Sequence, residues 1–355
     1  MLNFRIHWEA LFREKQMEFS KSTHIDRMIL KALHELGNSA GASTITTVLA
    51  GMGISLHPRS VRYHLLKMDR DGLTVCPARR KGRQLTEKGL QELHQADVIT
   101  RVGFVSARVD ELGYRMTLNA GSDTGTIIPN IALIGQKDLA RAIHFMTPVY
   151  ETGLSIGDLV AYKMYGEQIG GVIIPRGKIA LATICSMTIN SIFTKEGIPV
   201  TSRFGGLLRM NNRIPVRFQT IIDYGGTSID PMKLFILAGL TDVWSCAKTG
   251  DGLIGASFRE FPSVAYEQVV KLLKHLHRKF NFKPVIVLGR PNMPLLEIPV
   301  SEGRTAMVVL GGLNPFAVLH EKGVPADIRP LEGLEALSTF KPFEDAAPIG
   351  RNELF

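Results

Sequence analysis

The chain has 355 residues, of which 45% are hydrophobic and 21% are charged, and its formal net charge is +9. This length accommodates two or three domains, and the composition is typical of soluble globular proteins. No apolar run approaches the roughly 18 residues that a membrane-spanning helix needs, so the sequence predicts no membrane partner. The three cysteines are far apart and form no disulfide or zinc-ligand pattern, which favours a reducing, cytoplasmic location.

The positive charge is unevenly distributed along the chain. Residues 1–95 contain 15 Lys and Arg against 9 Asp and Glu, whereas residues 96–355 contain 27 against 24. About a quarter of the chain therefore carries two thirds of the excess, which indicates an anionic partner for the N-terminal part. Residues 1–21 lack the clean hydrophobic stretch of a secretory signal and are interpreted as a leader segment.

Residues 22–72 are predicted to form three short helices. In the first, Ile25, Ile29, Leu33 and Leu36 recur at helical spacing before Gly37. The second starts near Ser43 or Thr44 and ends at Gly51. The third starts near Pro58, a favourable first-turn residue, and ends at Asp71–Gly72. Its apolar side contains Val61, Leu65 and Met68.

The segment after the third helix is predicted to form a basic hairpin. "LTVC" and "RQLT" are expected to be its strands, and the turn between them holds four cations within residues 79–83. Three helices followed by such a hairpin indicate a winged helix-turn-helix domain, in which one helix enters the major groove and a basic loop holds phosphate. The predicted DNA contacts are Arg59, Ser60, Arg62, Tyr63 and Lys67 on the third helix, and Arg79, Arg80, Lys81 and Arg83 in the wing. A winged helix that binds protein instead of DNA is the alternative.

From residue 100 onward the pattern changes to alternating strands and helices. "RVGFVSARV" (101–109) is expected to be a strand. Residues 179–200 resemble residues 305–326 at an offset of 126, and residues 153–185 resemble residues 226–258 at an offset of 73. We therefore expect three strand–turn–helix units beginning near 178, 252 and 304, in an α+β domain with mixed sheets.

Each repeated unit also predicts a local binding site at the start of its helix. Thr188, Ser263 and Asn314 are expected as helix caps, and free N–H groups at a helix start attract carboxylate or phosphate. Plain capping without a ligand is the alternative at each. Two arginines could hold a dicarboxylate, and glycines allow a ligand to approach the backbone closely. The candidate effector-binding residues are Arg203, Gly205, Gly206, Arg259, Gly311, Gly312 and Asn314. A salt bridge between repeats is the alternative for the two arginines.

The sequence contains no motif that indicates catalysis. No Walker A loop, dinucleotide-binding glycine motif, HExxH or GxSxG occurs, and the Asp residues mostly lie beside Gly or Pro, as in turns. We therefore expect no enzyme, no cofactor and no metal site. An enzyme domain attached to a DNA-binding head is the alternative.

Four stretches resemble the regulatory domain of the NrpR family of nitrogen repressors. They are "INSIFTKEGIPVTSRFGGLLRM", "DYGGTSIDPMKLFILAGLTDVW", "GDGLIGASFREFP" and "GGLNPFAVLHEKGVP", and the resemblance covers residues 22–335 with the winged helix included. Some family members have two regulatory domains, whereas this chain has length for one.

The resemblance implies a repressor that binds double-stranded operator DNA as a homodimer or homotetramer and responds to the small dicarboxylate 2-oxoglutarate. We predict four parts of the chain: a leader (1–21), a winged-helix domain (22–96), a nitrogen-regulatory-type effector-binding and oligomerisation domain (100–338) and a C-terminal tail (339–355). A regulator that responds to a different metabolite is the alternative.

Overall fold

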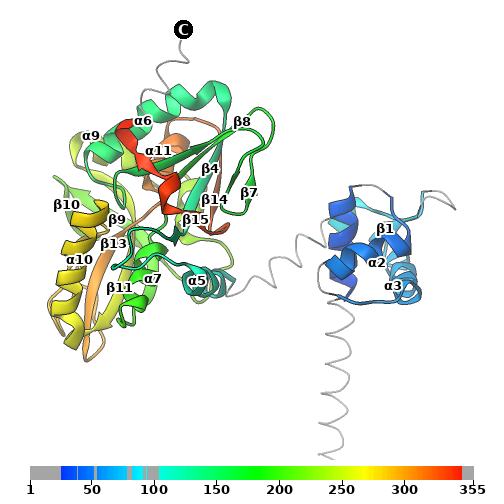
Figure 1. Ribbon diagram of the computed structural model, residues 1–355, viewed down its shortest axis with the longest axis horizontal. Helices are drawn as coiled ribbons and strands as arrows, with labels where there is room; N and C mark the ends of the chain where they lie inside the picture. Colours follow the sequence, from blue (N-terminus) through cyan, green and yellow to red (C-terminus); the bar gives the residue numbers. More distant parts are fainter. Residues whose placement is uncertain are drawn as a thin grey trace, which may run out of the picture. The chain divides into compact units, whose positions relative to one another are not determined.

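The computed structural model describes residues 25–37, 39–51, 54–77, 82–90, 93 and 104–345. The chain forms two compact units, residues 1–101 and residues 102–355 (Figure 1). The predicted leader and the end of the predicted tail lie outside the described residues. No helix in the described ranges is both long and apolar enough to cross a membrane.

The first unit is built as the sequence predicts, from three helices and a hairpin. Residues 25–36 are helical and are followed by α2 (Ala42–Gly51) and α3 (Pro58–Arg70). The wing strands β1 (Thr74–Val75) and β2 (Gln84–Leu85) pair antiparallel. The predicted apolar faces meet in one core that contains Ile29, Leu33, Ile45, Leu49, Val61, Leu65 and Met68.

The second unit begins with a helix where a strand is expected. Residues 104–115 form α5 (Phe104–Arg115), so the strand prediction for 101–109 is wrong over the described part. Val105, Leu112 and Met116 are buried, and their spacing of seven and four residues matches one face of a helix. The nine-residue window of the prediction was too short to distinguish this spacing from strand alternation.

Two five-stranded sheets form the framework of the second unit. The first has the order β14–β4–β8–β5–β16 and the second has the order β10–β9–β11–β13–β12. Every registered strand pair in them is antiparallel, which corrects the expectation of mixed sheets. The strands of the first sheet are β4 (Pro129–Gly135), β5 (Leu159–Lys163), β8 (Lys178–Ile184), β14 (Ala326–Pro330) and β16 (Lys341–Pro342). Those of the second are β9 (Thr201–Asn211), β10 (Ile214–Asp223), β11 (Gly252–Pro262), β12 (Val285–Leu288) and β13 (Arg304–Leu310).

Helices cover both sheets. α6, α9 and α11 pack on one another, α9 also contacts β11, and α8 contacts β9 (Figure 1). The helices are α6 (Leu139–Glu151), α7 (Met187–Lys195), α8 (Pro231–Leu237), α9 (Val243–Thr249), α10 (Tyr266–Phe280) and α11 (Asn314–Glu321). Three 3-10 turns accompany them, η1 (Gln136–Asp138), η2 (Ser263–Ala265) and η3 (Leu337–Thr339). The small hairpins are β3 (Thr126–Ile127) with β15 (Glu335–Ala336), and β6 (Gln168–Ile169) with β7 (Val172–Ile173).

The second unit consists of two half-domains with the same order of elements. The first half-domain contains, in order, β4, η1, α6, β5, β8, α7 and β9. The second contains β11, η2, α10, β12, β13, α11 and β14 in the same order, and corresponding elements start 123 to 127 residues apart. The predicted repeat at offset 126 is therefore confirmed. The match at offset 73 is wrong, because it aligns strand β5 with helix α8. The unit formed by β4, η1 and α6 was missed.

The two half-domains exchange their last strands. β9 follows the first half-domain in sequence but pairs with β11 in the second sheet, and β14 follows the second half-domain but pairs with β4 in the first sheet. Each sheet thus needs a strand from the other half of the chain. β16 also pairs with β5, and Phe343 is buried against Tyr150, so the boundary predicted at residue 338 falls inside the folded unit.

Candidate DNA interface and candidate effector site

Helix α3 separates a buried face from a cationic outer face. His57 caps its start by accepting a hydrogen bond from the Arg59 backbone N–H at 3.2 Å. Arg59, Ser60, Arg62 and Tyr63 are exposed, and Tyr63 retains 70% of its accessible surface. In the described part of the chain no carboxylate forms an ion pair with Arg59 or Arg62. Both guanidinium groups are therefore available to a ligand.

Lys67, another predicted DNA contact, has a structural partner in the first helix. Its Nζ lies 3.1 Å from Asp26 Oδ2, and this hydrogen bond raises the pKa of the lysine. The other oxygen of Asp26 contacts His64 Nδ1. Asp26 thereby connects the first helix to the outer side of α3 and fixes the orientation of the predicted recognition helix.

The carboxylate of Asp69 anchors the described part of the wing to α3. Asp69 accepts a hydrogen bond from Thr74 Oγ1 at 2.6 Å and an ion-paired hydrogen bond from Arg83 Nε at 2.8 Å. Arg83 also bridges to Ala40 through backbone hydrogen bonds of 2.9 Å, so the wing contacts the segment before α2 as well. The DNA contact predicted for Arg83 stays a prediction, and Arg79, Arg80 and Lys81 lie outside the described residues.

In the second unit, two equivalent side chains join the starts of α7 and α11 to backbone groups of other segments. Thr188 Oγ1 hydrogen-bonds Ile128 N at 3.1 Å and Ile128 O at 3.2 Å. Asn314 Oδ1 accepts from Gly255 N at 2.8 Å, and its Nδ2 donates to Gly255 O at 3.1 Å. The predicted capping role is wrong for both, because neither side chain bonds its own helix: Thr188 bonds the backbone of Ile128, just before β4, and Asn314 bonds that of Gly255 in β11.

The predicted glycines are explained by close backbone packing. A Cβ atom on Gly311 would lie 2.8 Å from the carbonyl oxygen of Gly255, and one on Gly312 would lie 2.3 Å from that of Ile184. On β9, a Cβ atom on Gly205 would lie 3.0 Å from the hydroxyl of Tyr224, and one on Gly206 would lie 2.6 Å from the carbonyl oxygen of Thr220. Effector binding at these positions stays a prediction.

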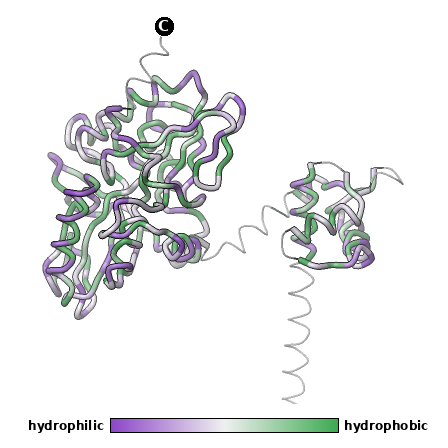
Figure 2. The backbone as a smooth tube through the Cα atoms, viewed as in Figure 1, coloured by the Kyte–Doolittle hydropathy of each residue, from purple (hydrophilic) through white to green (hydrophobic). Residues whose placement is uncertain are grey.

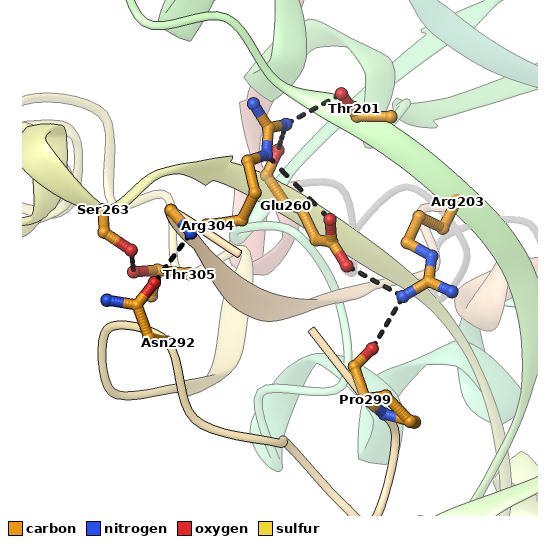
Figure 3. Close-up of polar contacts among 9 residues, drawn as sticks. Thr201, Arg203, Glu260, Ser263, Asn292, Pro299, Arg304 and Thr305 are labelled. Atoms are coloured by element: carbon orange, nitrogen blue, oxygen red, sulfur yellow. Dashed lines mark hydrogen bonds and ion pairs between the residues drawn. The ribbon is translucent and has the colours of Figure 1, made fainter. Parts of the chain in front are cut away.

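Arg203 belongs to a network of charges around the buried carboxylate of Glu260 that Figure 3 shows. Its guanidinium donates to Glu260 Oε1 and to the carbonyl oxygen of Pro299, each at 2.8 Å. Arg304 approaches the other oxygen of Glu260 at 3.9 Å and donates to the backbone oxygen of the same residue at 2.9 Å (Figure 3). The salt bridge between repeated elements that was the alternative reading of Arg203 is thus present. Arg203 also lines a groove of about 520 Å³ beside β10.

Arg259 is completely buried, and the groups that it hydrogen-bonds among the described residues are neutral. Its side chain donates to Ser257 Oγ at 3.0 Å, to Ser186 O at 3.0 Å, to Ser186 Oγ at 2.8 Å and to Asn190 Oδ1. Burial lowers the pKa of this guanidinium. Among the described residues no carboxylate forms an ion pair with it, although buried charges are usually paired. The site therefore combines an uncompensated positive charge with the start of α7, a combination that favours an anion.

Two further ionisable side chains lie near this cluster, and sequence reasoning did not select them. Burial raises the pKa of the Tyr224 hydroxyl, which is also hydrogen-bonded to Ser257. Asp230 caps α8 by accepting from Met232 N and Lys233 N, and burial raises its pKa despite those bonds. Ser186 and Asn190 were missed as well. No spacing in the sequence links these residues, since β11 and α7 meet only after the half-domains associate.

The fold and these sites define a winged-helix DNA-binding domain joined to a regulatory domain of two half-domains. Residues 102–342 match the family described as NrpR regulatory domains NRD1 and 2, and residues 27–93 match the Ribonuclease R winged-helix domain. The chain belongs to the NrpR family.

Curated relatives agree with this assignment. The chain is 34% identical to the global nitrogen regulator NrpRI of Methanosarcina mazei, over 88% of this chain and 96% of that protein. It is 31% identical to the global nitrogen regulator NrpR of Methanococcus maripaludis, over 90% of this chain but only 55% of that protein. A solved nitrogen repressor-like protein of Methanococcus jannaschii matches with a TM-score of 0.57 and 27% identity, over 68% of this chain and 98% of that one. The relatives are named as regulators, and none as an enzyme.

Proposed function

We propose that this protein is a transcriptional repressor of nitrogen-assimilation genes that acts in the cytoplasm. The observation that supports it most directly is the outer face of α3, where Arg59 and Arg62 are exposed and have no acidic ion-pair partner among the described residues. The sequence also predicts a basic wing tip in residues 79–83. Base edges in the major groove are read by such side chains, and backbone phosphate is held by such a wing. The nitrogen-related role follows the named relatives.

We propose further that a small dicarboxylate, 2-oxoglutarate, releases the protein from its operator. The buried cluster around Arg259 supports an anionic effector, because its guanidinium has no carboxylate partner within the described residues. Arg259 is fully buried in this state. A ligand that reaches it would therefore favour a conformation in which the start of α7 has moved away from β11, and that shift would change the arrangement of the DNA-binding heads in a homodimer or homotetramer.

A gel-shift titration on the protein's own promoter region tests both proposals. We expect specific binding that millimolar 2-oxoglutarate weakens. By thermodynamic linkage, operator DNA must weaken effector binding by the same factor. Specific binding that 2-oxoglutarate does not weaken would support a DNA-binding regulator and refute this effector. No binding above that to competitor DNA would refute the repressor function.

A comparison of the variants Arg259→Met and Arg203→Met tests whether the response of operator binding to 2-oxoglutarate depends on Arg259. We expect Arg259→Met to bind the operator with unchanged affinity and to lose the effect of 2-oxoglutarate, because the proposed counter-charge is removed. Circular dichroism provides the control for folding. A full response in a folded Arg259→Met protein would exclude this cluster as the effector site.

A further inference from the structure

Helix α10 has a stripe of cations on its solvent side. Lys271, Lys274 and Arg278 are exposed, and their spacing of three and four residues places them on one helix face. The opposite face is buried through Val269, Leu272 and Leu276. Figure 2 shows the resulting alternation of hydrophilic and hydrophobic segments along this helix. We call these three cations the α10 stripe.

The α10 stripe lacks the ion pairs that would explain it as structural. Within residues 104–345, no carboxylate pairs with Lys271, Lys274 or Arg278, whereas the neighbouring Lys279 lies 2.9 Å from Asp123. Cations in the last turn of a helix stabilise its dipole, which accounts for Arg278. Lys271 and Lys274 lie too far from the C-terminal end at Phe280 for this effect, because it fades beyond the last turn.

The surroundings of the α10 stripe favour a polyanion over a protein partner. Protein interfaces rely on exposed aromatic and aliphatic anchors at their centre. None of the large exposed hydrophobic side chains among the described residues lies on α10. The stripe borders a shallow groove of about 430 Å³ whose lining includes Lys271 and Arg278, together with Ala120, Gly121, Glu196, Gln268, Leu272 and His275. Contact by charge alone is what a nucleic-acid backbone requires.

We propose that the α10 stripe binds the phosphate backbone of DNA, as a sequence-independent contact in addition to the winged helix. This inference rests on the proposed DNA-binding function. Lys271 and Arg278 are seven residues apart, which is about 10 Å along a helix axis. One DNA strand carries a phosphate about every 3.4 Å of axis, so the three cations can each meet a separate phosphate.

The test compares two triple variants of the full chain that lose the same charge. One is K271Q/K274Q/R278Q, and the control is K137Q/R176Q/K178Q, which removes three exposed cations from η1, from the turn before β8 and from the first residue of β8. The affinity for a non-specific duplex of about 40 base pairs, about four helical turns, is measured by fluorescence anisotropy between about 50 and 200 mM salt. We expect the slope of log K against log salt to flatten by up to about 2.7 in the first variant, at about 0.9 per lost contact, and not in the control.

The outcomes separate this inference from the proposed function. Equal slopes in the two variants would overturn the contact at α10, because only net charge would then matter. A wild-type chain without salt-dependent DNA affinity would refute the DNA-binding function itself. If the triple variant does not fold, the single variant K274Q tests the contact at α10. It should flatten the slope by about one third of the full effect, roughly 0.9.

Discussion

At the scale of single residues, α3 distinguishes side chains that hold the helix in place from side chains available to DNA. Lys67 is paired with Asp26, whereas Arg62 is exposed and has no ion-pair partner among the described residues. The sequence predicted both as DNA contacts because it shows only that they share the polar side of the helix. Asp26, in the first helix, is 41 positions away from Lys67 in the sequence, and no local pattern predicts their pairing.

Arg62→Ala is expected to relax sequence preference more than it weakens overall binding. A side chain that reads a base edge contributes about 1–3 kcal/mol of discrimination at that base pair. Affinities for the operator and for single-base variants of it, measured at one salt concentration, give the result. Lys67→Ala is the matched comparison and should change the preference less. A preference that survives intact in Arg62→Ala would show that this residue does not enter the groove.

Asp230 is expected to make the stability of the regulatory domain depend on pH. Burial raises its pKa in the folded state, so the folded protein holds this proton more tightly than the unfolded chain. Its contribution is fully present below the ordinary aspartate pKa of about 4 and is lost as pH rises through the folded-state value. Asp230→Asn retains a helix-capping side chain and cannot titrate. Urea unfolding of both proteins between about pH 4 and 7 should therefore show a flatter pH dependence in the variant, and identical profiles would contradict the assignment.

At the scale of elements, local periodicity was sufficient for α3 and insufficient for α5. Helix α3 has a first-turn proline, a cap and three apolar residues on one face, so each local signal agrees with the tertiary structure. Residues 101–109 include only the first turns of α5, and the buried Leu112 near its end and Met116 directly after it lie beyond that window. The wing strands contain two residues each, and their position depends on Asp69 as much as on their own sequence.

Asp69→Ala is expected to weaken DNA binding although it removes a negative charge. Electrostatics alone predict tighter binding, because the protein becomes more positive. Loss of the bonds to Thr74 and Arg83 frees the wing from α3, and ordering it again on DNA costs affinity. The affinity of both proteins for the operator, measured at a single salt concentration, shows whether binding becomes weaker or tighter. We expect the affinity to fall several-fold. Tighter binding by a folded Asp69→Ala protein would show that the wing does not need this anchor.

At the scale of the whole molecule, strand exchange makes the regulatory domain indivisible. A chain of residues 102–228 would contain β4 without β14 and would leave the inner edge of β9 unpaired, because β11 is absent. Exposed edges of this kind favour aggregation. We expect this half-domain to be insoluble or unfolded alone and to become soluble when it is co-expressed with residues 229–355. Size-exclusion chromatography and circular dichroism measure both, and a folded, monomeric half-domain would contradict the argument.

The sequence alone was sufficient to determine the winged helix, the family, the α+β class and one internal repeat. These depend on periodicity, turn residues and long motifs, all of which are local or linear properties of the chain. Only the tertiary structure decided the antiparallel sheets, the exchange of β9 and β14, and the burial of Arg259 against Ser186 and Asn190. Those features depend on which distant segments pack together. The free energy that selects this packing comes from the whole buried core, so no short segment of the sequence is sufficient to predict it.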